Sequence, residues 1–193
     1  NQRAGTLPGG YRRAALVEML DDLGWGYHAV VPNFQDLRSP EDDVHRGLGI
    51  VNLHTMPVHT VFDGVDFHAT RSGDRTIVEY RTPAGPLTTV TFYDDRMRAA
   101  GITISHVERY PFQCPQDYAA LEYLFRQARA VPNYEGYAAE AERIGARGFV
   151  VACIHSAASP MHYLQRDIMP LETFFFEAHD RPDEVRSLAH TID

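Results

Sequence analysis

The chain has 193 residues, enough for one domain with a substantial core, because single domains commonly run to about 100–200 residues. Its net charge of −8 and its 18 scattered basic residues, all Arg, argue against a nucleic-acid surface and exclude a lysine nucleophile. The composition is 44% hydrophobic, yet no apolar run reaches the roughly 18 residues of a membrane span. We therefore expect a globular protein with neither a nucleic-acid partner nor a membrane partner.

Residues 1–49 predict an N-terminal helical segment. Within residues 10–23 an apolar stripe recurs at helical spacing, and Gly24 follows as a stop signal. The stripe consists of Ala15, Leu16, Met19, Leu20 and Leu23. Residues 38–49 are polar, with a helix start at Ser39-Pro40, and are expected to lie mostly at the surface.

Residues 50–105 predict an antiparallel meander. Three β-branched and aromatic stretches up to Tyr93 are separated by the turn signals "RSGD" and "PAGP". The histidines of this region do not predict a metal site. His54 and His59, and likewise His59 and His68, are an odd number apart, which places each pair on opposite faces of a regular strand. We interpret them as ordinary histidines of a sheet.

Residues 106–193 alternate between helix and strand. Helices are predicted from about Pro115 to Arg129 and over 133–148, with Asn133 as the cap. The apolar stretch 149–154 follows as a buried strand, and three short helices begin at Ser159-Pro160, Pro170 and Pro182. This order is typical of a parallel α/β sheet covered on both faces, and Phe174–Phe176 are expected to pack in the core.

The stretch "GFVVACIHSAASPMH", residues 148–162, holds the candidate binding residues. In parallel α/β folds, ligands lie outside the carboxyl ends of strands, where His155 and Ser156 would fall. His155 can give or take a proton near neutral pH, and Ser156 can hydrogen-bond a carboxylate. For both residues a purely structural role is an equal alternative. Cys153 is expected in the core, and Ser159 as a helix cap.

Several phrases in order resemble the uroporphyrinogen decarboxylase superfamily, particularly its branch related to methylcobamide:coenzyme M methyltransferases. They are "YRTPAGPLTT" (80–89), "HVERYPFQCPQDYAALEYLF" (106–125) and the stretch from "NYEGYAAEAERIGARGFVVACIH" through "DRPDEVRSL" (133–188). The resemblance covers roughly residues 47 to 190 and depends on the order of short motifs.

The resemblance implies a (β/α)8 barrel, which takes about 250 residues or more. The chain would then hold the N-terminal portion of a barrel, with residues 106–193 as its first part and the meander before it. Members decarboxylate porphyrinogen acetates without a cofactor, or move methyl groups from a corrinoid to a thiol through zinc. The Arg-rich motif that holds porphyrinogen carboxylates is not in this sequence, so the resemblance favours methyl transfer.

The implied partners are a small-molecule substrate or a corrinoid protein, and the implied pocket residues are His155, Ser156 and Met161. The zinc ligands of the methyltransferases, a His-x-Cys and a later Cys, belong to the second half of the barrel. No cofactor or metal is therefore expected in this chain, and zinc and a corrinoid are expected for the full enzyme. The two cysteines form no CxxC pair, which favours a reducing, cytoplasmic compartment.

A different class of function is a non-catalytic binding or interaction module. A partial barrel would present unpaired strand edges and apolar surface, which proteins normally cover. In that case the chain would associate with another protein or with its own copy as a homodimer.

Overall fold

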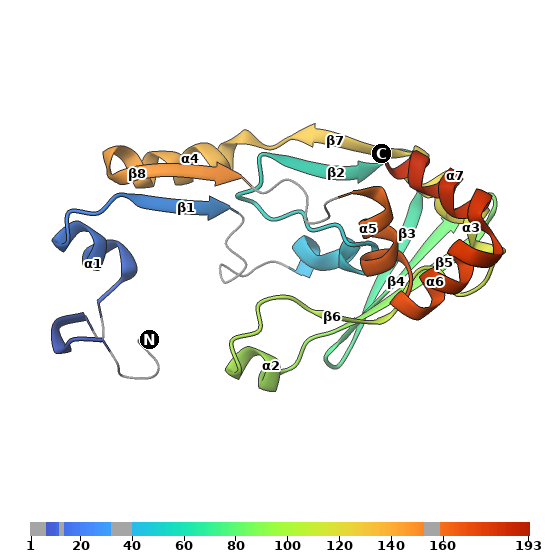
Figure 1. The fold of residues 1–193 in the computed structure, drawn as a ribbon, viewed down its shortest axis with the longest axis horizontal. Helices are drawn as coiled ribbons and strands as arrows, with labels where there is room; N and C mark the ends of the chain where they lie inside the picture. The colour runs from blue at the N-terminus through green and yellow to red at the C-terminus, as the bar shows by residue number, and fades with distance from the viewer. Residues whose placement is uncertain (1–6, 12–13, 32–39, 153–158) are drawn as a thin grey trace.

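The structure is a computed structural model that describes residues 7–11, 14–31, 40–152 and 159–193 (Figure 1). Its α-helices are α1 (Leu16–Asp22), α2 (Asp95–Ala99), α3 (Asp117–Arg126), α4 (Tyr134–Ile144), α5 (Pro160–Tyr163), α6 (Leu171–Asp180) and α7 (Pro182–Ile192). Short 3₁₀ helices are η1 (Gly9–Tyr11), η2 (Pro40–Leu48) and η3 (Gly145–Arg147), and η4 (Leu164–Ile168) is a π-helical turn. None of the described helices has the length and apolar character needed to cross a bilayer.

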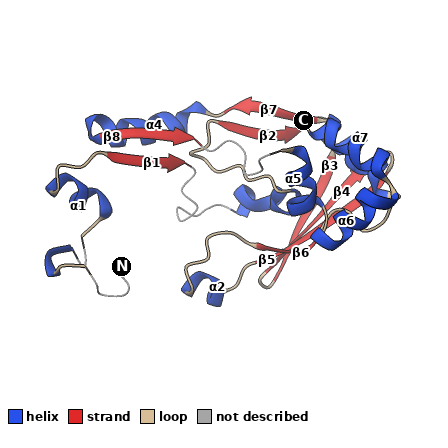
Figure 2. Cartoon of the chain, in the orientation of Figure 1, coloured by secondary structure: helices blue, strands red, loops and turns tan. Residues whose placement is uncertain are grey.

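The strands within the described ranges form three sheets, so the protein is α/β (Figure 2). The strands are β1 (Tyr27–Val31), β2 (Val58–Phe62), β3 (Asp66–Ser72), β4 (Arg75–Thr82), β5 (Gly85–Phe92), β6 (His106–Arg109), β7 (Ala128–Pro132) and β8 (Gly148–Ala152). One sheet is the antiparallel meander β3-β4-β5-β6, the second is the antiparallel pair β2-β7, and the third is the parallel pair β1-β8.

The expected antiparallel meander is present, but its strands differ from the prediction. The stretch "HTVFDGVDFHAT" is not one strand, because Gly64 adopts a φ of 68° in a turn that separates β2 from β3. The strand β2 leaves the meander and pairs with β7 instead. The meander has instead a further strand at its other edge, β6, which pairs with β5 across a bulge at Val90 and Thr91.

The α1 helix is shorter than the sequence pattern predicts. It starts at Leu16, is preceded by Ala15 as N-cap, and buries none of its residues. The Glu18 carboxylate accepts a hydrogen bond from the Ala15 N–H at 2.9 Å, which holds the first turn. The predicted stop is confirmed, since Gly24 has a φ of 64° directly after the helix.

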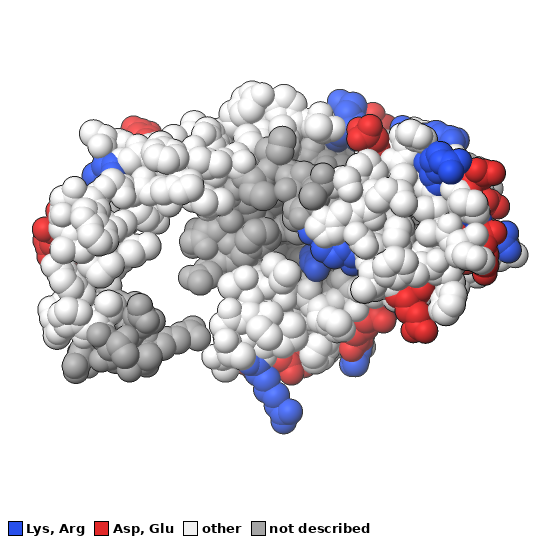
Figure 3. Space-filling view, viewed as in Figure 1, with Lys and Arg blue, Asp and Glu red and all other residues white. Residues whose placement is uncertain are grey.

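The parallel pair β1-β8 was expected to be covered on both faces, and this prediction is wrong. The α4 helix packs against both strands, but Val30, Phe149 and Val151 keep 52%, 61% and 42% of their surface exposed. Apolar composition predicted burial on both faces, yet the described residues cover only the face toward α4. Figure 3 shows few charged side chains over this end of the molecule, in contrast to the end that carries α3, α6 and α7.

The core lies between the meander and the C-terminal helices. The α3 helix packs against β4, β5 and α7, and its buried stripe includes Tyr118, Leu121, Leu124 and Phe125. The fully buried side chains of this core include Tyr80, Leu87, Leu121, Leu124, Leu164, Ile168 and Leu188. The Phe174–Phe176 prediction is right only for Phe174, because Phe175 and Phe176 point away from the core and are 61% exposed.

The segment before Gly49, expected at the surface, instead enters this core through Leu48 and His45. Leu48 is fully buried, and the His45 ring lies against Phe62 and Phe67 with its Nδ1 3.0 Å from the Tyr80 hydroxyl. Burial lowers the pKa of His45 to about 4, because a charged imidazole would lose its hydration among these rings. His45 is thus neutral in the folded protein at physiological pH.

This neutral histidine predicts a pH-dependent stability. Since the pKa of His45 lies below its ordinary value of 6.5, the unfolded chain takes up a proton between pH 6.5 and 4 that the folded chain does not. The free energy of unfolding should therefore fall as pH drops through this window, by about 3 kcal/mol in all. When the free energy of unfolding is measured in urea from pH 7.5 to 4, its slope against pH should be shallower for His45→Gln than for the wild type. The exposed-site control His68→Gln should keep the wild-type slope, and equal slopes for all three proteins would contradict the prediction.

Candidate functional site

The residues singled out in the sequence are only partly described by the structure. Cys153, His155 and Ser156 lie outside the described residues. Ser159 is confirmed as a helix cap, since its Oγ accepts a hydrogen bond from the His162 N–H at 3.2 Å. Met161 is 42% exposed on α5, where it lines a shallow depression of about 240 Å³ together with α7 residues such as Arg186 and His190.

The two strands that precede the candidate loops run side by side in the same direction. Val31 is in register with Ala152, so the carboxyl ends of β1 and β8 meet at one edge (Figure 1). Parallel pairing of this kind places the segments that follow the two strands at the same side of the sheet. Residues 153–158, which contain His155 and Ser156, follow β8 directly.

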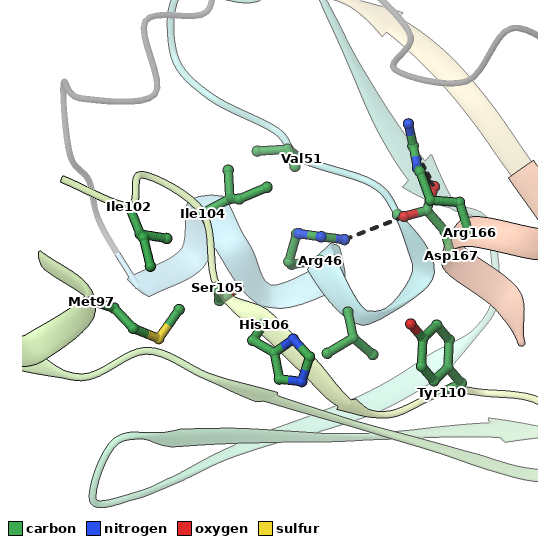
Figure 4. Close-up of a pocket in the computed structure, with 12 residues that line it drawn as sticks. Arg46, Val51, Met97, Ile102, Ile104, Ser105, His106, Tyr110, Arg166 and Asp167 are labelled. Atoms are coloured by element: carbon green, nitrogen blue, oxygen red, sulfur yellow. Dashed lines mark hydrogen bonds and ion pairs between the residues drawn. The ribbon is translucent and has the colours of Figure 1, made fainter. Parts of the chain in front are cut away.

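A larger cavity of about 460 Å³ lies elsewhere, between η2, the loop after α2, β6 and η4 (Figure 4). Its polar lining consists of Arg46, Ser105, His106, Tyr110, Arg166 and Asp167. Its remaining lining consists of Gly49, Val51, Met97, Ile102, Ile104 and Val107. The volume lies within the range of about 300–1,000 Å³ that is usual for small-molecule sites.

A buried carboxylate forms the polar end of this cavity. Asp167 is only 1% exposed. Its Oδ2 accepts from the Arg166 guanidinium, at 2.8 Å from Nε and also from Nη2, and its Oδ1 lies 3.4 Å from Arg46 Nη1. A buried carboxylate is tolerated only with such partners, because desolvation of an unpaired charge is expensive. The ion pair therefore fixes both guanidinium groups at the cavity wall.

The segment that carries Arg46 is held against the C-terminal half of the chain at two further points. The Tyr163 hydroxyl donates to the Leu48 carbonyl oxygen. Gly49 has a φ of 75°, and a Cβ placed on it would lie 2.6 Å from Cβ and Cγ of Asp167. Only glycine combines this backbone conformation with so close an approach, so Gly49 is part of the site's construction.

Of the three histidines noted in the sequence of this region, His59 has a structural role. The Asn133 side chain, predicted to cap α4, makes no cap bond and instead donates to the carbonyl oxygens of His54 and Met56 at 3.0 and 2.8 Å. His59 Nε2 lies 2.9 Å from both the Leu53 oxygen and Asn133 Nδ2. Asn133 thus connects the loop before β2 to the start of α4. Its position before the helix had indicated only a capping role.

Sequence reasoning missed Arg46 and Asp167, because 121 positions separate them and neither stands in a recognisable motif. The one local signal was the run "RGLG" at residues 46–49, whose second glycine marks a close approach. Comparison of the chain with protein-family models, curated proteins and solved structures gives no match. The site is therefore interpreted from its own geometry.

The close approach of Gly49 to Asp167 predicts that Gly49→Ala lowers the free energy of unfolding more than Gly73→Ala does. Gly49→Ala and Gly73→Ala both place a methyl group on a left-handed residue, with φ of 75° and 59°, which costs about 1–2 kcal/mol. Around Gly73 no atom lies within 4 Å of the new Cβ, whereas at Gly49 it collides with Asp167. Urea unfolding should show that Gly49→Ala loses a further ~1–3 kcal/mol, as overpacking of a buried site does. Equal destabilisation would argue against the tight packing of Gly49 on Asp167.

Proposed function

We propose that the chain forms the first part of a (β/α)8 barrel of the uroporphyrinogen decarboxylase superfamily, in an enzyme of corrinoid-linked methyl transfer. The motif order over residues 80–188 supports the family. The observation that carries the barrel is the parallel pairing of β8 with β1, a strand within residues 1–49, which were wrongly predicted to be a helical segment. The α4 helix packs against this pair, and such barrels consist of parallel strands with helices outside. The exposed apolar face of this pair is a surface that further barrel elements would cover.

The substrate pocket of this enzyme is proposed at the carboxyl ends of β1 and β8. In the sequence, His155 and Ser156 come directly after β8, and barrel enzymes carry their active-site loops after such strands. Met161 is proposed for the same pocket from the resemblance alone, because the structure places it on α5 beside Arg186 and His190 of α7. The cavity beside Asp167 is proposed as a small-molecule site of the same enzyme. Porphyrinogen decarboxylation is the alternative activity of the superfamily, and it is disfavoured because the sequence lacks the Arg-rich motif that holds porphyrinogen carboxylates.

The cofactors that methyl transfer implies are zinc and a corrinoid. Within the described ranges, no three His, Cys, Asp or Glu side chains come together as a metal site. The described residues thus do not fit a zinc ion, and we derive no step through it; the resemblance assigns its ligands to the second half of the barrel. The corrinoid is proposed to arrive on a partner protein in the cytoplasm.

Methyl transfer is tested in the protein that carries this chain. With methylcobalamin and a thiol as substrates, we expect thiol methylation that requires zinc. His155→Ala and Ser156→Ala should each lower kcat/KM by about tenfold, the effect of losing one hydrogen bond to a bound substrate. His68→Ala, on the exposed strand β3, serves as the control. Absence of both turnover and bound zinc would refute the methyltransferase proposal.

A second candidate function, an interaction module, is favoured by the exposed side chains of β1 and β8. Val30, Phe149 and Val151 form an exposed apolar face. Figure 3 shows few charged side chains over the end of the molecule that holds β1 and β8. Exposed apolar surface next to unpaired strand edges is a common site of association. In this proposal the face binds a second copy of the chain, and no chemistry is required of the loops that follow the strands.

Association through this face is tested by light scattering. If the face forms a homodimer, the chain should be dimeric at micromolar concentration, and Phe149→Ser should weaken the dimer by about tenfold or more. Phe175→Ser is a matched control, because Phe175 is equally exposed, at 61%, but lies on α6. A monomer at all concentrations, or an equal effect of both substitutions, would rule out this module.

A further inference from the structure

At the polar end of the 460 Å³ cavity, the charge of the Arg46 guanidinium is only partly neutralised by the described residues. Arg166 makes the short contacts with Asp167, at 2.8 Å from Nε to Oδ2. Arg46 reaches the other carboxylate oxygen at 3.4 Å, and in the described part of the chain this is the one carboxylate within ion-pair distance of it. A guanidinium carries five N–H donors in a planar fork, so most of those of Arg46 remain for a further acceptor.

The opposite end of the cavity is apolar. Met97 of α2 and Ile102 and Ile104 of the following loop line it, and Figure 4 shows them together on the side away from Arg166 and Asp167. Ile102 and Ile104 are 44% and 42% exposed, although they are large aliphatic side chains. A hydrocarbon group in the cavity would remove their surface from water, which favours binding.

A third feature lies at the polar end. The Tyr110 hydroxyl is turned toward the Arg46–Asp167 pair in Figure 4. A phenolic O–H can donate to a carboxylate that already sits on a guanidinium, and such charge-assisted bonds are stronger than neutral ones. Tyr110 directly follows β6 and Arg46 lies in η2, so the cavity brings donors from two distant parts of the chain to one place.

From this polarity we infer that the cavity binds a small monocarboxylic acid with a hydrocarbon body. The carboxylate accepts hydrogen bonds from the Arg46 guanidinium and the Tyr110 hydroxyl, and the hydrocarbon body contacts Met97, Ile102 and Ile104. A guanidinium suits this ligand because its fork matches the two carboxylate oxygens. The inference depends on the proposed small-molecule role of the cavity and is independent of methyl transfer.

Octanoate and octanamide test the inference, because they share the hydrocarbon and differ in charge. In titration calorimetry the wild-type protein should bind octanoate about tenfold or more tightly than octanamide, as expected for charge-assisted bonds. Arg46→Met should remove this preference by weakening octanoate about tenfold. Arg129→Met is the control, since Arg129 pairs with Asp63 at the surface, 2.8 Å from Nε to Oδ2. It should bind both probes as the wild type does.

The apolar end is tested separately with Ile102→Ser, at an exposed position where the substitution does not disturb the core. It should weaken octanoate several-fold and leave butanoate unchanged, because only the longer chain reaches Ile102. Equal affinity for octanoate and octanamide, or no binding of either by the folded wild type, would overturn the inference whether or not Arg46→Met folds. These equilibrium measurements involve no turnover, so failure of methyl transfer and failure of carboxylate binding are observed separately.

Discussion

The buried carboxylate of Asp167 is the constraint on which the arrangement of this protein depends. It joins η4, late in the chain, to Arg46 in η2, near its start, across 121 positions. With Arg166 it forms an ion pair that is costly to leave incomplete, because a lone charge at 1% exposure would have no water to solvate it. The close packing of Gly49 on Asp167 and the Tyr163–Leu48 hydrogen bond hold the segment that carries Arg46 in place. Together these contacts form the polar wall of the cavity.

The protein has two regions with different degrees of burial. On one side, η2 closes over the meander with Leu48 and His45, and the C-terminal helices complete a core around Tyr80 and Leu124. On the other side, β1 and β8 form a parallel pair whose face away from α4 is exposed. Parallel sheets in proteins are normally covered on both faces. This uncovered face is common to both of our functional proposals, which differ in what covers it.

The candidate chemistry is divided between two places. The loops after β1 and β8 are where an α/β fold would place a substrate, and His155 and Ser156 belong there by sequence. The cavity beside Asp167 is instead built from η2, β6 and η4, with a cationic end and an aliphatic end. The two places use different side chains, so the proposal for each can hold or fail without the other.

The sequence alone determined the elements whose signal is local. Periodicity placed α3, Pro and Ser placed the starts of α5 and α7, and turn residues placed the hairpins of the meander. Tertiary structure decided what depends on distant partners: that β2 pairs with β7, that Asn133 binds the loop before β2, and that Arg46 meets Asp167. The physical reason is that helix, cap and turn preferences depend on near neighbours. Burial and pairing depend on which surfaces meet, so the exposed Phe149 and Phe175 look in sequence like core residues.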